Sequence, residues 1–153
     1  MFDTNVKVVP VLDAAADAFN GDPTTSYINM AHFESCRFVI QEGASTAAGR
    51  TVTVLEATSS TGGSATAIDF HYQMGTDADE GAVTSATTAG FSITASTASR
   101  VISIFVDAQE LSTDNKFVAV TVTETTAAPT VAGAITAILS GPRYSGPFMT
   151  ALS

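Results

Sequence analysis

The chain has 153 residues, 45% of them hydrophobic and only 14% charged, which is enough to bury one sizeable core and argues against general disorder. Fifteen Asp and Glu against six Lys and Arg give a formal net charge of −9 at pH 7. This balance argues against binding to nucleic acid or to an anionic membrane, because both interactions need clustered positive charge.

The cysteine count and the N-terminal segment indicate the cellular compartment in which the protein is made. Cys36 is the only cysteine of the sequence, so an intramolecular disulfide is impossible and a cysteine-based zinc spacing does not occur. The segment MFDTNVKVVPVLD has no basic stretch followed by a long apolar run, and no apolar run approaches the ~20 residues of a membrane span. We therefore expect a protein made in a cytoplasm, without a signal peptide or a membrane anchor.

Apolar and polar residues alternate along most of the chain, which is the pattern of half-buried strands. Residues 6–12 (VKVVPVL) predict a first strand, and Pro10 confines it to a sheet edge or an extended arm. The clearest alternation lies in residues 67–74 (AIDFHYQM), which predict a single strand with Phe70 and His71 on opposite faces. The same pattern predicts further strands at residues 36–41, 50–57, 90–94, 100–108, 116–124 and 133–140.

Connections rich in Gly, Ser, Thr and Asp separate these segments, as in a β-sandwich or a barrel. We predict an all-β fold: an antiparallel, jelly-roll-like β-sandwich of about eight strands with an extended N-terminal arm. Helical patterning is confined to residues 14–19 (AAADAF) and 107–111 (DAQEL). The predicted organisation is a single domain with a strand and arm at residues 1–30, a sandwich at 31–140 and a C-terminal tail at 141–153.

Two histidines, His32 and His71, are the candidate general bases, and no signature of a nucleophile elbow, a zincin, a P-loop or a dinucleotide fold accompanies them. His71 lies between Asp69 and Gln73 on the polar face of its strand. Asp69 and His71 would act as a base and its orienter only with a nucleophile across the sheet. We favour an ordinary exposed or interface histidine, and predict no catalytic residue and no enzymatic activity.

An acidic cluster, Asp77, Asp79 and Glu80, lies in a loop bounded by glycine, and such oxygen ligands suit calcium. The EF-hand spacing is absent, so a solvated loop is the favoured interpretation. We predict no metal site and no cofactor.

The C-terminal stretch GPRYSGPFMTALS sets Arg143 and Tyr144 between two Gly-Pro breaks and ends in apolar residues. Arg and Tyr are enriched at protein interfaces, and an apolar tail is unfavourable in water. The alternative is that Arg143 caps the end of the sandwich on a carboxylate while Tyr144 covers the edge of the core. The predicted interface residues are Arg143, Tyr144, Phe148, Met149, Leu152, Phe2, Val8, Val9 and Val11.

A succession of strand and turn phrases runs from about Val6 to Tyr144, without a catalytic signature. The phrases are VKVVPVLDAAADAF, YINMAHFESCRFVIQEGAS, TVTVLEATSSTGG, TAIDFHYQM, RVISIFVDAQELSTDNKFVAVTVTET and AITAILSGPRYSG. Together these phrases resemble the head decoration, or capsid cement, proteins of tailed bacteriophages.

The resemblance implies a non-enzymatic β-sandwich subunit on the outer surface of a phage head, where it bridges capsomers. The implied partners are the major capsid protein and further copies of the same chain, as a homotrimer at or near threefold positions. The N-terminal arm and the C-terminal tail would supply the contacts.

Two other classes of function stay open at this point. One is a different virion subunit, in the tail or at the head–tail joint. The other is a β-sandwich module that binds a glycan with calcium at the acidic loop, against which the absence of Trp counts.

Overall fold

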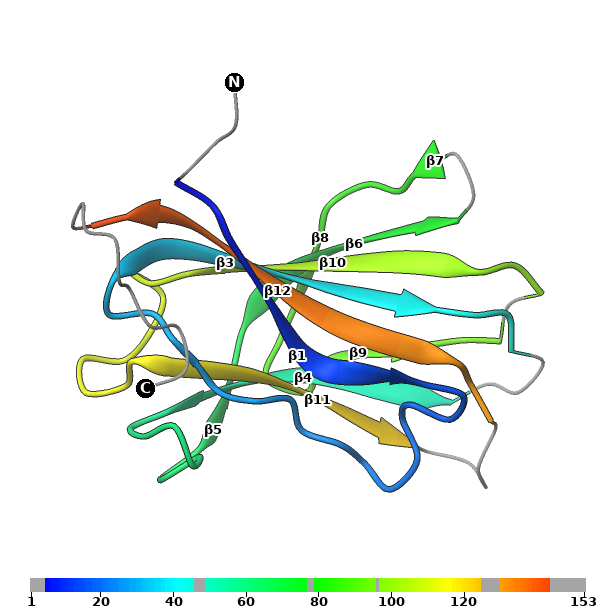
Figure 1. Ribbon diagram of the computed structural model, residues 1–153, viewed down its shortest axis with the longest axis horizontal. Helices are drawn as coiled ribbons and strands as arrows, with labels where there is room; N and C mark the ends of the chain where they lie inside the picture. Colours follow the sequence, from blue (N-terminus) through cyan, green and yellow to red (C-terminus); the bar gives the residue numbers. More distant parts are fainter. Residues whose placement is uncertain (1–4, 46–48, 77–78, 96, 125–129, 144–153) are drawn as a thin grey trace.

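The computed structural model describes residues 5–45, 49–76, 79–95, 97–124 and 130–143. Over these residues the chain forms twelve strands and no helix, and every pair of strands is antiparallel. The predicted all-β, antiparallel class is therefore confirmed, and the two sheets have a sandwich-like arrangement (Figure 1).

The larger sheet has seven strands, of which β8 pairs on β6 beside the main order. In spatial order the others are β1 (Lys7–Ala15), β12 (Gly133–Pro142), β3 (Phe33–Glu42), β10 (Arg100–Asp107), β6 (Phe70–Thr76) and β7 (Asp79–Glu80), and β8 is Thr84–Ala86. The smaller sheet has five strands: β2 (Ile28–Asn29), β11 (Phe117–Glu124), β4 (Arg50–Ala57) and β5 (Thr66–Ile68), with β9 (Phe91–Ile93) pairing on β4.

The long-range pairs are nested along the chain. The pairs are β1 with β12, β2 with β11, β3 with β10 and β4 with β5. The first and last of these strands are therefore neighbours, and the chain turns back on itself between β4 and β5. Because the three outer pairs join residues far apart in sequence, their register is fixed by the hydrophobic pattern rather than by tight turns.

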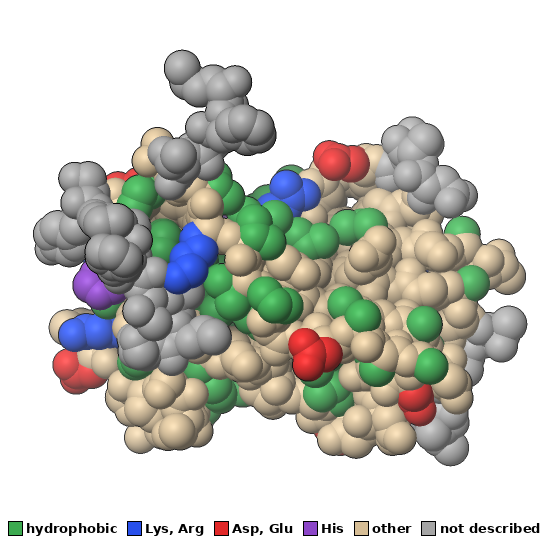
Figure 2. Space-filling view, in the orientation of Figure 1, with side chains coloured by type: hydrophobic (Ala, Val, Ile, Leu, Met, Phe, Trp, Pro, Cys, Tyr) green, Lys and Arg blue, Asp and Glu red, His purple; other side chains and the backbone are tan. Residues whose placement is uncertain are grey.

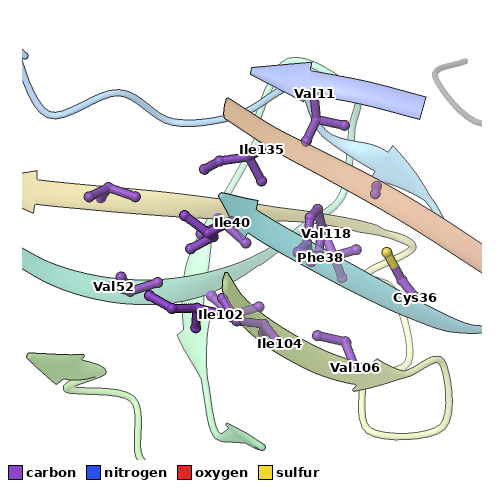
Figure 3. Packing of buried hydrophobic residues seen from close by; sticks show 14 of the residues in the cluster. Val11, Cys36, Phe38, Ile40, Val52, Ile102, Ile104, Val106, Val118 and Ile135 are labelled. Carbon is purple, nitrogen blue, oxygen red and sulfur yellow. The ribbon is translucent and has the colours of Figure 1, made fainter. Parts of the chain in front are cut away.

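The core lies between the two sheets and is built by the alternation that the sequence shows. Phe38 and Ile40 of β3 and Ile102 of β10 point inward from the larger sheet, and Val52 and Val118 meet them from the smaller one (Figure 3). All five are completely buried. Burying each such side chain stabilises the fold by roughly 1.5–3 kcal/mol, so this layer holds the two sheets together.

The prediction of one strand over residues 67–74 is wrong. Residues 66–68 form β5 in the smaller sheet and residues 70–76 form β6 in the larger sheet, so the chain changes sheet at Asp69. Both sheets face the same core, so Ile68 and Phe70 still point inward and the alternation continues across the corner. The Asp69 carboxylate accepts the backbone N–H of Thr88 at 2.8 Å and fixes this corner.

Neither of the two segments with helical patterning is a helix, and residues 107–111 form a single turn as expected. Ala14 and Ala15 end β1 and turns follow, while the second segment is a turn after Asp107, the last residue of β10. In the first segment tertiary packing overrides propensity: the Ala18 N–H donates to the Val131 carbonyl at 3.0 Å, and Phe19 packs in the core.

The N-terminal region contains an edge strand, as Pro10 predicts. β1 pairs only with β12, and its register shifts on either side of Leu12. A proline and such irregularities are common devices that keep an edge strand from pairing with another chain.

Candidate interaction surface

The side chains that point away from the core on β1, β12, β3, β10 and β6 form one surface, which we call the outer face. Along each of these strands, the side chains of the outer face alternate with the side chains that point into the core. Its members are Val8 and Pro10; Ala134, Thr136, Ile138 and Ser140; Ser35, Arg37, Val39 and Gln41; Val101, Ser103, Phe105 and Asp107; and His71, Gln73 and Gly75. Of these side chains, Arg37 and Asp107 carry a formal charge at neutral pH, and the exposed Asp13 of β1, which follows the inward-facing Leu12, adds another carboxylate at the edge.

An apolar patch lies on the outer face around Val39. The strand register sets Thr136 and Ser103 directly beside Val39, which makes Ile138, Phe105 and Val101 its diagonal neighbours. Diagonal neighbours on one face of a sheet have their Cα atoms roughly 7–8 Å apart, so these side chains are within reach of one another.

Val8 extends the patch to the β1 edge, because it pairs with Ile138, and it is 63% exposed. Figure 2 shows many hydrophobic side chains and few charged ones across the centre of one side of the molecule.

The large hydrophobic residues that are exposed in the described part of the chain belong to the larger sheet or directly precede its strands. Val8 and Val101 lie on the outer face, Val6 directly precedes β1, and Val83 precedes β8. Val8 at the β1 edge and Val101 on β10 are linked across the face by the half-buried apolar side chains around Val39.

Arg37 lies beside this patch, between Ile138 and Phe105. Its guanidinium carbon is 5.4 Å from the centroid of the Phe105 ring, and its Nη2 donates to Ser103 Oγ at 2.6 Å. Its Nε is buried and has no hydrogen-bond partner among the described residues. Stacking on an aromatic face leaves the edge of a guanidinium available to a carboxylate.

A second group of charges is buried at one end of the core, and the sequence analysis missed it. The Glu42 Oε2 atom accepts a hydrogen bond from Arg50 Nη2 at 2.9 Å, and the Glu42 Oε1 atom pairs with the Nε atom of Arg100. Glu42 and Arg100 pair across the larger sheet, whereas Arg50 belongs to the smaller sheet, so the cluster ties the two sheets together.

The sequence carries a signal for this cluster. Arg50 and Arg100 are two of only six basic residues, and each is the first residue of a strand at a position where the alternation points inward. Arg50 is 0% exposed and its guanidinium carbon lies 5.7 Å from the centroid of the Phe19 ring.

Glu124 pairs with Arg50 across β11 and β4 and lies near two further carboxylates. Burial raises the pKa of Glu124 above its ordinary value, and the negative charges of Asp17 and Asp22 raise it further, against the lowering effect of Arg50. The Asp22 carboxylate also accepts the Glu124 backbone N–H at 2.7 Å.

Glu56 anchors the loop between β10 and β11 at the other end of the sandwich. Its carboxylate accepts the Ser112 backbone N–H at 2.8 Å and the Ser112 hydroxyl at 2.6 Å. Burial alone would raise the pKa of Glu56, but the hydrogen bonds from Ser112, Asn115 and Thr66 outweigh it and hold the pKa below the ordinary value.

Arg143, an interface candidate from the sequence, is exposed beside this loop. Its backbone N–H donates to the His32 carbonyl at 2.9 Å, and β12 continues to Pro142 rather than ending at residue 140. Together with Leu111, Asn115 and Lys116 it lines a groove of about 540 Å³.

The other interface candidates are distributed between the surface and the core. Val8 is exposed, whereas Val9 and Val11 are buried in the chain's own core. The remaining candidates, Phe2, Tyr144, Phe148, Met149 and Leu152, lie outside the described residues.

The residues considered for catalysis and metal binding are not brought together. Asp69 holds its corner, and His71 lies on the outer face opposite Ser85 and Phe105. Within the described ranges no group of three or more His, Cys, Asp or Glu side chains has the geometry to hold a metal ion.

Of the acidic loop, Asp77 lies outside the described residues and Asp79 is placed only as a residue of β7. The Glu80 carboxylate accepts a hydrogen bond from Gln73 at 3.3 Å. Cys36 is buried, and burial raises the pKa of its thiol.

None of the described segments is a helix long and apolar enough to cross a membrane. No protein-family model, curated protein or solved structure matches this chain.

Proposed function

We propose that the protein is a non-enzymatic structural subunit of a virion, and specifically a capsid decoration protein bound to the outer surface of a phage head through the outer face of its larger sheet. The observation that carries this proposal is the apolar patch formed by the exposed Val8 and Val101 together with the half-buried Ile138, Val39 and Phe105. A subunit that bridges capsomers needs such a surface and repeats its contacts many times over a shell, so modest affinities suffice.

The fold that suits this role is a jelly roll. The eight strands of the nested pairs are β1, β2, β3, β4, β5, β10, β11 and β12. Counted one to eight in chain order, they are arranged 1-8-3-6 in the larger sheet and 2-7-4-5 in the smaller. Rolling up a long hairpin of four nested pairs produces this arrangement, which has eight strands in two Greek keys. The short strands β6 to β9 then form an insertion.

The partners in this proposal are the major capsid protein and further copies of the chain, as a homotrimer without a cofactor. Edge pairing through β1 is disfavoured by Pro10 and by the shifts of register at Leu12. We therefore assign the capsid contact to the outer face, and the contacts between copies to the N-terminal segment and the C-terminal tail.

The test is binding of the purified protein to heads that lack it. Replacing Val8 and Val101 together by Asp places two charges on the patch and is expected to weaken binding at least about tenfold, because burying unpaired charges is costly. Thr113→Asp, an equal type of change in an exposed loop, is the matched control. Wild-type protein that does not bind heads, or binding that survives the double replacement, contradicts the proposal.

A further inference from the structure

We propose that Arg37 is a receptor for a carboxylate: the outer face binds a protein partner that presents one Asp or Glu side chain surrounded by apolar residues. This inference deepens the proposed function. The identity of the partner rests on that function, whereas the argument that the site binds a carboxylate rests only on the outer face.

The first argument is the position of the charge. Arg37 is the only cation among the members of the outer face, and it is flanked by Ile138, by Phe105 and by Val39, which lies two residues further along β3. A partner that covers this apolar patch necessarily covers Arg37 as well. Burying a guanidinium without a counter-charge is strongly unfavourable, so we expect a matching partner to bring a carboxylate.

The second argument is the way in which the side chain is held. The guanidinium is stacked on Phe105 and hydrogen-bonded to Ser103, which fixes its plane before a partner arrives. The Nε atom is buried, so only the terminal nitrogen atoms of the guanidinium could be reached by a docking partner. A fixed guanidinium with free donors loses little conformational entropy on binding, and the forked donors of arginine match the two oxygens of a carboxylate.

The chain does not supply the missing carboxylate itself within the described residues. Both ion pairs found there belong to Glu42. Asp107 is a diagonal neighbour of Arg37 on one side, but the guanidinium is hydrogen-bonded to Ser103 on the opposite side.

Charge complementarity also selects the kind of partner. A second copy docked face to face, with a two-fold axis near the patch, would bring two like-charged Arg37 guanidinium groups together, with Asp107 of each copy one diagonal position away as the available carboxylate. Nucleic acid and anionic lipid are disfavoured, because a single cation on a chain of net charge −9 does not offset the overall repulsion. A single carboxylate on an otherwise apolar protein surface fits both the charge and the patch.

The experiment on the isolated protein uses a blocked peptide of sequence SLELS and its uncharged counterpart SLQLS, titrated while the NMR signals of the protein are followed. We expect the glutamate peptide to shift the Arg37 Nε–H signal and the amide signals of Val39 and Phe105. Because hydrogen bonds to charged groups are the stronger ones, the glutamine peptide is expected to bind at least about fivefold more weakly.

Variants assign the preference to this one side chain. Arg37→Gln is expected to abolish the preference for the glutamate peptide, Arg37→Lys to keep part of it, and Lys116→Gln, which removes an exposed cation elsewhere, to leave it unchanged. Thermal unfolding confirms that each variant is folded. Equal binding of the two peptides, shifts away from the outer face, or no shift at about 10 mM peptide would overturn the inference.

A parallel measurement with heads that lack the protein separates this inference from the proposed function. Arg37→Gln is expected to weaken head binding at least about tenfold, with partial recovery in Arg37→Lys. If wild-type protein does not bind heads but the peptide preference holds, the proposed function fails and the carboxylate site stands. If heads bind wild type and Arg37→Gln equally and the peptides show no preference, the site fails and the proposed function stands.

Discussion

The buried ionic cluster and the outer face use arginine in opposite ways. Arg50 and Arg100 lie in the core and share the Glu42 carboxylate, which the chain itself provides. Arg37 lies on the outer face, stacked on an aromatic ring. A fully buried cation without a counter-charge strongly destabilises the folded state, so its partner is best supplied by the same chain. On a surface that water still reaches, the counter-charge can be left to another molecule.

The largest expected effect comes from removing the shared carboxylate. Glu42→Gln leaves Arg50 and Arg100 buried without a negative charge, and we expect the free energy of unfolding to fall by about 3–5 kcal/mol. Urea denaturation at neutral pH measures this loss. Glu80→Gln, which neutralises an exposed carboxylate, is the control and is expected to change stability by less than about 0.5 kcal/mol. A loss of less than about 1 kcal/mol in Glu42→Gln would show that the cluster is not needed for stability.

The next test compares adjacent residues of β10 that face opposite sides. Ile102 is 0% exposed and Val101 is 42% exposed. Ile102→Ala is expected to lower the free energy of unfolding by about 2–5 kcal/mol because it leaves a cavity. Val101→Ala is expected to cost less than about 1 kcal/mol, while it weakens binding to heads. Similar losses of stability in both variants would mean that the outer face belongs to the folding core rather than to an interface.

A smaller effect is expected at Glu56, a buried acid held by hydrogen bonds instead of arginines. The pKa of Glu56 lies below its ordinary value in the folded protein, so the stability that the charged form contributes is present at neutral pH and is lost as pH falls through that lowered pKa. Glu56→Gln should therefore lower the free energy of unfolding by about 1–3 kcal/mol at pH 7, and the difference from wild type should shrink toward about pH 3. A difference that stays constant with pH would contradict this assignment.

The smallest effect is expected at Glu124, whose contribution to stability changes with pH in the direction opposite to that of Glu56. The pKa of Glu124 is raised by burial and by Asp17 and Asp22, so the folded state binds the proton more tightly than the unfolded chain. The resulting stabilisation is present at acid pH and is lost as pH rises through the raised pKa. Glu124→Gln should match wild type near pH 4 and exceed it at pH 7 by less than about 1 kcal/mol, because solvent screens the repulsion. Unfolding curves at the two pH values measure this, and a variant less stable than wild type at pH 7 would show that the attraction of Arg50 dominates.

Strand positions were largely predictable from the sequence, because a side chain that must face a core repeats every second residue. Residues 50–57 coincide with β4, and the edge position of β1 followed from Pro10. The corner at Asp69 was not predictable, since the inward alternation runs on unchanged from β5 into β6. Residues 14–19 carry helical patterning without forming a helix, because an alanine-rich segment has helical propensity that only packing against distant strands overrides.

The interface was only partly predictable. Residue type alone pointed equally to Val8, Val9 and Val11, although two of them are buried in the chain's own core. Arg37 escaped notice because a lone arginine in a strand looks like an ordinary exposed residue until its neighbours on the other strands are known.

The sequence by itself determined the all-β class, the approximate strand positions, the acidic balance and the edge character of the first strand. These properties are local, because they depend on composition, on alternation and on the missing N–H of proline. Tertiary structure alone decided the nested pairing of strands, the sharing of Glu42 by Arg50 and Arg100, and the apolar patch around Val39 beside Arg37. Each of these depends on register between segments that are distant in the chain, and register is set by how the faces of two sheets pack and not by any one segment.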